Sequence, residues 1–161
     1  MEAARGCFVE ALEIRRQLAS QNVETYSPGI AMALNGLGQV EFELNDFQAA
    51  LRRLEEAVKI LESDPMSHLG VRLRERQTVW TNLGKVHRTD KGLERPNYGA
   101  ARDALRRAVN YAEEFRSSFH DRTLRKAIYS KMPDPYELLV EKVRTRCGCR
   151  PWRSQTRATV M

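Results

Sequence analysis

The chain of 161 residues has no long apolar run. No segment approaches the roughly 18 consecutive apolar residues that a membrane span needs. The N-terminus, MEAARGCFVEALEIRR, mixes acids and bases with apolar positions and so lacks the uninterrupted apolar core of a secretory signal. We therefore expect a cytoplasmic protein that has no membrane as a partner.

Cysteine is also scarce, with residues only at positions 7, 147 and 149, which argues against a disulfide framework. Cys7 lies on the apolar side of the first expected helix, so we expect it to be a buried reduced thiol. Cys147 and Cys149 have a C-x-C spacing rather than the C-x2-C of common zinc sites, and we expect plain reduced thiols. We expect no metal and no cofactor.

Groups that could carry out catalysis do not converge in the sequence. His68, His87 and His120 fall in three different elements and show no metal-binding spacing. Gly36 and Gly38 lie inside an expected helix, where a close helix neighbour explains them better than a bound phosphate. We therefore expect no enzyme and no small-molecule substrate.

The net charge of +6 belongs to the end of the chain. Five arginines and no acid follow Val143, so the 22 basic and 21 acidic residues before them give a net charge of only +1. The body is close to neutral, and the basic character belongs to residues 144–161, which we expect to be disordered. Nucleic-acid contact through this tail remains an alternative function, but we do not expect nucleic acid as the main partner.

Apolar residues recur every three or four positions between Ile30 and Glu62, with a break at Asn45-Asp46. This pattern predicts two amphipathic helices joined by a short turn, with Ser27 capping the first helix and Asp46 the second. Pro28 would then occupy the first helical position, where its missing N–H costs nothing. Further helices are expected over residues 2–20, 68–89 and 98–116, the last one capped by Asn97.

The same pattern occurs three times. The second-type helices share an A-x3-large-x2-A string at Ala4, Phe8, Ala11 and Ile14, at Ala50, Leu54, Ala57 and Ile60, and at Ala101, Leu105, Ala108 and Tyr111. The first-type helices share Leu34, Leu37 and Gly38 with Trp80, Leu83 and Gly84. Because one thin hairpin cannot bury both faces of its helices, the repetition predicts a stacked helical array with narrow contacts at its small residues.

The faces of these helices lead to further expectations. Tyr98 should point inward with the alanines that follow it, and Trp80 should belong to the core. The arginine pairs 52–53 and 106–107 should lie on solvated outer faces. The first helix has no first-type partner, so its apolar side would lack a cover, which leaves open a longer array or self-association through this helix.

At these residues the chain resembles the tetratricopeptide repeat family, in particular the longer repeats of kinesin light chains. Ala11 to Arg15 matches an A-L-x-I-R element, and Ala31 to Gly38 matches A-x-x-L-N-x-L-G. The chain departs from the family pattern at Thr81 and His87. The resemblance implies an all-α right-handed superhelix of antiparallel hairpins over residues 1–116.

The resemblance also implies a concave groove that binds a peptide or a partner domain without turnover. The residues that match groove positions are Asn35, Gln39, Phe42 and Glu43 in one repeat and Thr81, Lys85 and Arg88 in the next. An asparagine there can hydrogen-bond a peptide backbone through its carbonyl and its amide. The alternative is that these residues are merely exposed and polar.

Residues 117–143 are expected to form helices that cap the array. This part resembles the segment that follows the repeats in bacterial proteins with a caspase-like CHAT peptidase domain. The residues that carry the resemblance are Phe115, Phe119, Asp121, Leu124, Arg125, Tyr136 and Glu137. A second alternative function is therefore the regulatory part of a CHAT peptidase or signalling NTPase without its effector domain.

Overall fold

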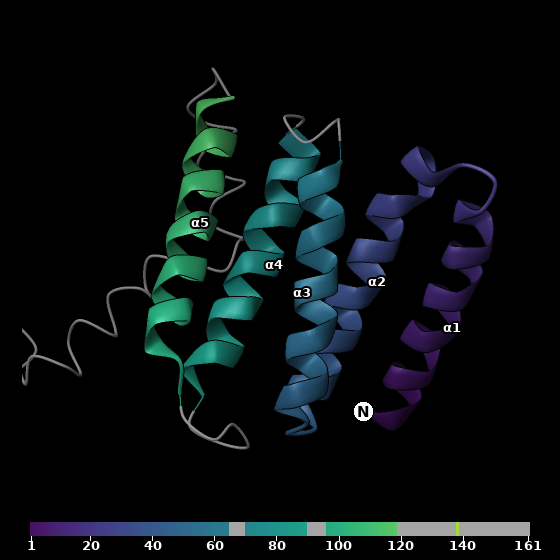
Figure 1. The fold of residues 1–161 in the computed structure, drawn as a ribbon, viewed down its shortest axis with the longest axis horizontal. Coiled ribbons are helices and arrows are strands. Elements are labelled where there is room, and N and C mark those ends of the chain that lie inside the picture. Colours follow the sequence, from purple (N-terminus) through teal and green to yellow (C-terminus); the bar gives the residue numbers. More distant parts are fainter. Residues whose placement is uncertain (65–69, 90–95, 119–137, 139–161) are drawn as a thin grey trace, which may run out of the picture.

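The computed structural model describes residues 1–64, 70–89, 96–118 and 138. Within these ranges all regular secondary structure is helical, and the five named helices lie side by side in chain order (Figure 1). They are α1 (Glu2–Ala19), α2 (Val23–Glu43), α3 (Phe47–Ser63), α4 (Gly70–Arg88) and α5 (Tyr98–Ser117). The predicted all-α fold is confirmed. The expected C-terminal helices, the arginine tail and most of the CHAT-like residues lie outside the described residues.

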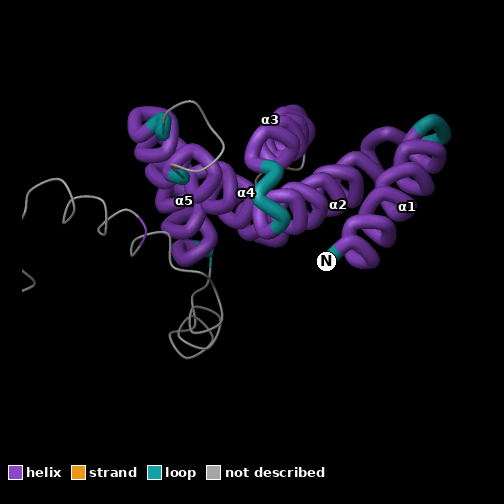
Figure 2. Tube along the Cα trace, turned by 90° about the horizontal axis from the view of Figure 1, so that it is seen from below, coloured by secondary structure: helices purple, strands orange, loops and turns teal. Residues whose placement is uncertain are grey.

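Each helix packs on the next one in the chain, and α2 also contacts α4. Figure 2 shows α3 on one side of α2 and α4. The chain therefore forms two hairpins, α2–α3 and α4–α5, preceded by the second-type helix α1. None of the described helices combines the length and apolar character that a membrane span requires.

A glycine sits at a close contact between the two helices of each hairpin. A Cβ added to Gly38 would lie 3.0 Å from Cγ of Leu54, and one added to Gly84 would lie 2.7 Å from Cγ of Leu105. The neighbouring backbone oxygens, of Ala50 and Ala101, would be at 3.4 and 3.5 Å. The repeat seen in the sequence is thus a repeat of packing, and the expected narrow contacts at Gly38, Ala50 and Ala101 are confirmed.

The turn between α2 and α3 and the start of α5 have the helix caps that the sequence predicts. Oδ1 of Asp46 accepts a hydrogen bond from the Ala49 N–H at 3.0 Å, and Oδ1 of Asn97 accepts one from the Ala100 N–H at 3.0 Å. Asn45 has a φ of 63°, a left-handed conformation that asparagine tolerates better than most residues. The predicted caps at Asp46 and Asn97 are confirmed.

The predicted start of α2 is wrong. The helix begins at Val23, its cap is Asn22, whose side chain accepts from the Thr25 N–H, and Pro28 lies inside it. Oγ of Ser27 donates instead to the Val23 carbonyl. Asn22 is as strong a cap as serine and lies one turn earlier. The helix therefore forms around Pro28, although proline removes one backbone donor there.

Three predictions about helix faces also need correction. Cys7 is exposed rather than buried, because Phe8 and Leu12 turn toward α2 and no described helix covers the Cys7 side of α1. Tyr98 is 48% exposed, and it is the first residue of α5, at the end of the helix. Trp80 is only half-buried and packs against the edge of the core, where the Arg107 guanidinium lies 4.7 Å from its ring centroid.

Both arginine pairs were expected on solvated outer faces, and three of the four side chains are exposed. Arg52 and Arg106 are exposed, and so is Arg107, which also forms an ion pair with Glu62 at 3.0 Å. Arg53 is half-buried, because its guanidinium forms an ion pair with the buried carboxylate of Glu41 on α2.

Candidate functional site

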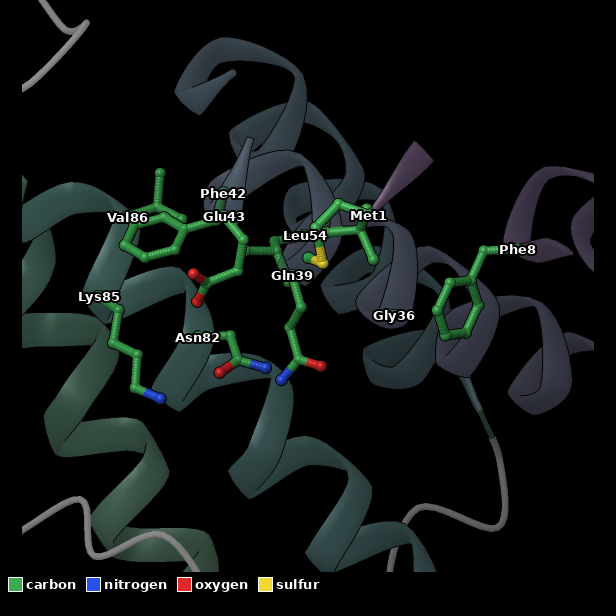
Figure 3. Close-up of a pocket in the computed structure, with 12 residues that line it drawn as sticks. Met1, Phe8, Gly36, Gln39, Phe42, Glu43, Leu54, Asn82, Lys85 and Val86 are labelled. Carbon is green, nitrogen blue, oxygen red and sulfur yellow. The ribbon is translucent and has the colours of Figure 1, made fainter. Parts of the chain in front are cut away.

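A cavity of about 410 Å³ lies between α1, α2 and α4, with Leu54 of α3 in its lining. Figure 3 shows its side chains. The apolar ones come from all four helices and from the start of the chain: Met1, Phe8, Val40, Phe42, Leu54 and Val86. The glycines Gly36 and Gly38 add no side-chain bulk on α2. This hollow is therefore built from α1, the α2–α3 hairpin and α4.

Polar groups come from two helices that face each other across the cavity. From α2 come Gln39 and Glu43, and from α4 come Asn82 and Lys85. In Figure 3 Gln39 and Asn82 extend into the same space. Each helix contributes residues spaced i, i+3 and i+4, namely Gln39, Phe42 and Glu43 on α2 and Asn82, Lys85 and Val86 on α4. This spacing places each set on one helical face.

Four of the seven residues expected in a groove line this cavity: Gln39, Phe42, Glu43 and Lys85. Asn35 is buried instead, and its Oδ1 accepts a hydrogen bond from Nδ2 of Asn82 at 2.9 Å. The side chain of Asn35 therefore links α2 to α4. Its amide oxygen already accepts this hydrogen bond. Its place in the cavity lining is taken by Asn82.

Thr81 and Arg88 do not line the cavity. Thr81 is fully buried, and its Oγ1 donates to the Gln77 carbonyl at 2.7 Å. In the sequence repeat, Thr81 corresponds to Asn35. The cavity, however, lies on the side of α4 that faces α2, and the residue on that side is the next one in the chain, Asn82. Asn82 could have been found from its helical spacing to Lys85 and Val86.

Glu41, two residues from Gln39, is an unusual buried carboxylate. Its side chain is 2% exposed, and Nε of Arg53 lies 3.6 Å from its Oε1. No described residue hydrogen-bonds its Oε2. Burial raises the pKa of Glu41 above its usual 4.5, although Arg53 and Arg5 oppose this shift.

We expect Glu41→Gln to stabilise the protein at neutral pH. Because the folded-state pKa of Glu41 is raised, the folded chain carries the cost of a buried charge at every pH above that pKa. The cost disappears as the pH falls below 4.5, where the carboxyl is protonated in the unfolded chain as well. The gain from glutamine should thus be largest at neutral pH and should shrink toward pH 4.

Urea denaturation of both proteins between pH 4 and 8 measures this difference. Glu43→Gln removes one charge from an exposed position on the same helix and controls for net charge. A Glu41→Gln protein that is less stable at pH 8 would mean that the attraction of Arg53 outweighs burial.

The cavity lining combines polar groups with an apolar surface. It presents two amides, one carboxylate and one ammonium group beside apolar walls. Among the described residues no group of three or more His, Cys, Asp or Glu side chains could hold a metal ion. His87, the one described histidine, is half-buried and outside the cavity lining, and its burial lowers its pKa against the opposing effect of Glu55. The arrangement suits noncovalent recognition.

Comparison with known proteins finds a similarity over the first part of the chain. The family model described as Tetratricopeptide repeat matches residues 1–63, which span α1, α2 and α3. No curated protein and no solved structure matches the chain. The α4–α5 hairpin, beyond the matched residues, repeats the glycine contact of the α2–α3 hairpin. Residues 1–63 are therefore similar to tetratricopeptide repeats, and the α4–α5 hairpin shares the packing of the α2–α3 hairpin.

Proposed function

We propose that the protein is a non-catalytic interaction module that holds a segment of a partner polypeptide in the cavity between α1, α2 and α4. Tetratricopeptide repeats generally mediate protein–protein interaction. The observation that carries the proposal here is the composition of the cavity. Its apolar walls, with polar side chains from α2 and α4 beside them, are what a polypeptide segment needs, because such a segment presents side chains and backbone amides together.

The size and chemistry of the cavity suggest how the segment binds. A volume of about 410 Å³ accommodates one or two large apolar side chains, which would pack on Phe8, Phe42 and Val86. The amides of Gln39 and Asn82 can donate to and accept from a peptide backbone. Lys85 and Glu43 would then select for charge at either end of the contact.

Peptide selection on the intact chain tests this function. Peptides selected from a random display library are expected to lose at least about tenfold in affinity when Gln39→Ala and Lys85→Ala are combined, which corresponds to about 1.4 kcal/mol. Both residues line the cavity, and neither belongs to the buried core. Asn35 is left unchanged because its side chain supports Asn82.

Gln48→Ala with Lys59→Ala is the matched control. These two substitutions remove the same two side-chain types, one glutamine and one lysine, from exposed positions on α3. Peptides that bind both double variants as well as the unchanged protein would refute the cavity as the site.

A further inference from the structure

Lys85 is the one basic side chain in the lining of the cavity, and its charge is not paired there. The residue is half-buried, yet no described residue forms an ion pair or a hydrogen bond with its ammonium group. The other half-buried or buried lysines and arginines of the described chain each have a partner: Arg15, Arg53, Arg72, Arg76, Arg88 and Arg116. Lys85 therefore differs from all of them in presenting an unpaired charge to a hollow.

The acidic residue of the lining does not neutralise Lys85. Glu43, on the facing helix α2, forms no ion pair with it among the described contacts and lies at an exposed position. Water can continue to solvate Glu43 when the cavity is filled, whereas a segment that covers the half-buried Lys85 removes water from it. An ammonium group that loses water without gaining an acceptor costs free energy. A bound segment must therefore compensate the charge of Lys85.

We propose that the segment held in the cavity carries an acidic side chain that pairs with Lys85, beside the large apolar side chain that fills the hollow. This inference rests on the proposed function and names the class of segment that the site prefers. In Figure 3 the nitrogen of Lys85 and the amides of Gln39 and Asn82 are directed the same way. One stretch of chain can therefore meet the ammonium group with a side chain and the amides with its backbone.

A side-chain carboxylate fits this lining better than the carboxylate at the end of a chain. Terminal carboxylates are captured by clusters of backbone N–H groups. The walls that α2 and α4 contribute are helix sides, whose N–H groups are used within the helix. The Asn82 amide already donates to Asn35. Lys85, by contrast, is a point charge on a flexible stem and can pair with an aspartate or a glutamate.

Peptides selected on the intact chain from a random display library test this pairing. We expect them to contain an aspartate or glutamate at a constant distance from a large apolar residue. In amidated synthetic copies, replacing this acid by asparagine or glutamine should weaken binding at least about tenfold, measured by fluorescence anisotropy. The loss should be largely absent on a Lys85→Gln chain, because the acid then has no partner to lose. A Lys85→Arg chain keeps the charge and should bind the acidic peptides nearly as well as the unchanged chain.

Reversing the charge gives a second measurement. Selection from the same library on a Lys85→Glu chain should yield peptides with lysine or arginine in place of the acid. Lys59→Glu is the matched control, because it makes the same change at an exposed position on α3, outside the cavity lining. That chain should still select acidic peptides, and circular dichroism checks that each variant keeps its helices. Equal reversal by Lys59→Glu would mean that overall charge decides the selection, which would overturn the inference.

The remaining outcomes separate this inference from the proposed function. Peptides that lose affinity with Gln39→Ala but carry no acid would overturn the inference alone. The same holds for an acid whose removal costs as much on the Lys85→Gln chain as on the unchanged one. Binding that disappears on amidation of the peptide would overturn it in favour of a terminal carboxylate. If no peptide binds the cavity, the proposed function and this inference both fail.

Discussion

Arg76→Ala is expected to lower the free energy of unfolding by about 3 kcal/mol, since it removes a charged donor from a buried carbonyl. Arg76 is buried, and its Nε donates to the Leu61 carbonyl at 3.1 Å, while its NH2 group donates to the same oxygen. That carbonyl is among the last four of α3, which have no partner within the helix. A cation there also opposes the negative end of the helix dipole.

The contacts of Arg76 reach a third helix. Its guanidinium carbon lies 5.4 Å from the centroid of the Tyr111 ring on α5. A cation over an aromatic ring contributes about 0.5–2 kcal/mol, depending on how far it is removed from water. One side chain of α4 thus links the end of α3 to α5, and its loss should loosen the second hairpin against the first.

Urea denaturation followed by circular dichroism measures the effect. Arg74→Ala, at an exposed position on the same helix, should change stability by less than about 0.5 kcal/mol. Arg76→Lys keeps the charge but loses the two-nitrogen contact, so it should fall between alanine and the unchanged protein. An equal effect of Arg74→Ala and Arg76→Ala would contradict a specific role for Arg76.

Gly84→Leu is expected to destabilise the protein by about 2 kcal/mol, the balance of overpacking and a helix-propensity gain near 1 kcal/mol. The new Cβ would lie 2.7 Å from Cγ and 2.9 Å from Cδ2 of Leu105. Both contacts are far inside van der Waals distance, and the backbone oxygen of Ala101 at 3.5 Å limits retreat. Helices α4 and α5 would therefore have to separate.

Gly6→Leu provides the matched control, because nothing lies within 4 Å of a Cβ at Gly6 in α1. The same substitution there should stabilise the chain by about 0.5–1 kcal/mol through helix propensity alone. Leu105→Ala should partly rescue Gly84→Leu by making room, so the two changes together should cost less than their sum. A Gly84→Leu protein as stable as the Gly6→Leu protein would mean that α4 and α5 are not tightly packed at this glycine.

Local sequence patterns predicted much of the array. The break at Asn45-Asp46, the caps at Asp46 and Asn97, and the small residues at Gly38, Ala50 and Ala101 all have their expected roles. These features depend on residues a few positions apart or on a pattern repeated along the chain. The choice between two possible helix caps was harder to predict, since Asn22 rather than Ser27 caps α2.

The candidate site was predicted only in part, because it lies between elements. Gln39, Phe42, Glu43 and Lys85 line the cavity, whereas Asn35 and Thr81 are buried and Arg88 lies outside the lining. Asn82 lines the cavity because of the way α4 is rotated about its axis relative to α2. The sequence pattern of a single helix does not contain this rotation. Cys7 was misplaced for the same reason, since its burial depends on a neighbour of α1.

The sequence by itself determined that this protein is a stack of helix hairpins, because helical periodicity, caps and repeated small residues are written along the chain. Only the tertiary structure decided which polar side chains reach the cavity, which become buried links between repeats, and which face of α1 stays open. Those outcomes depend on how helices are rotated and spaced whose equivalent positions, such as Ala4, Ala50 and Ala101, lie 46 and 51 residues apart. The packing of all five helices sets this rotation and spacing together.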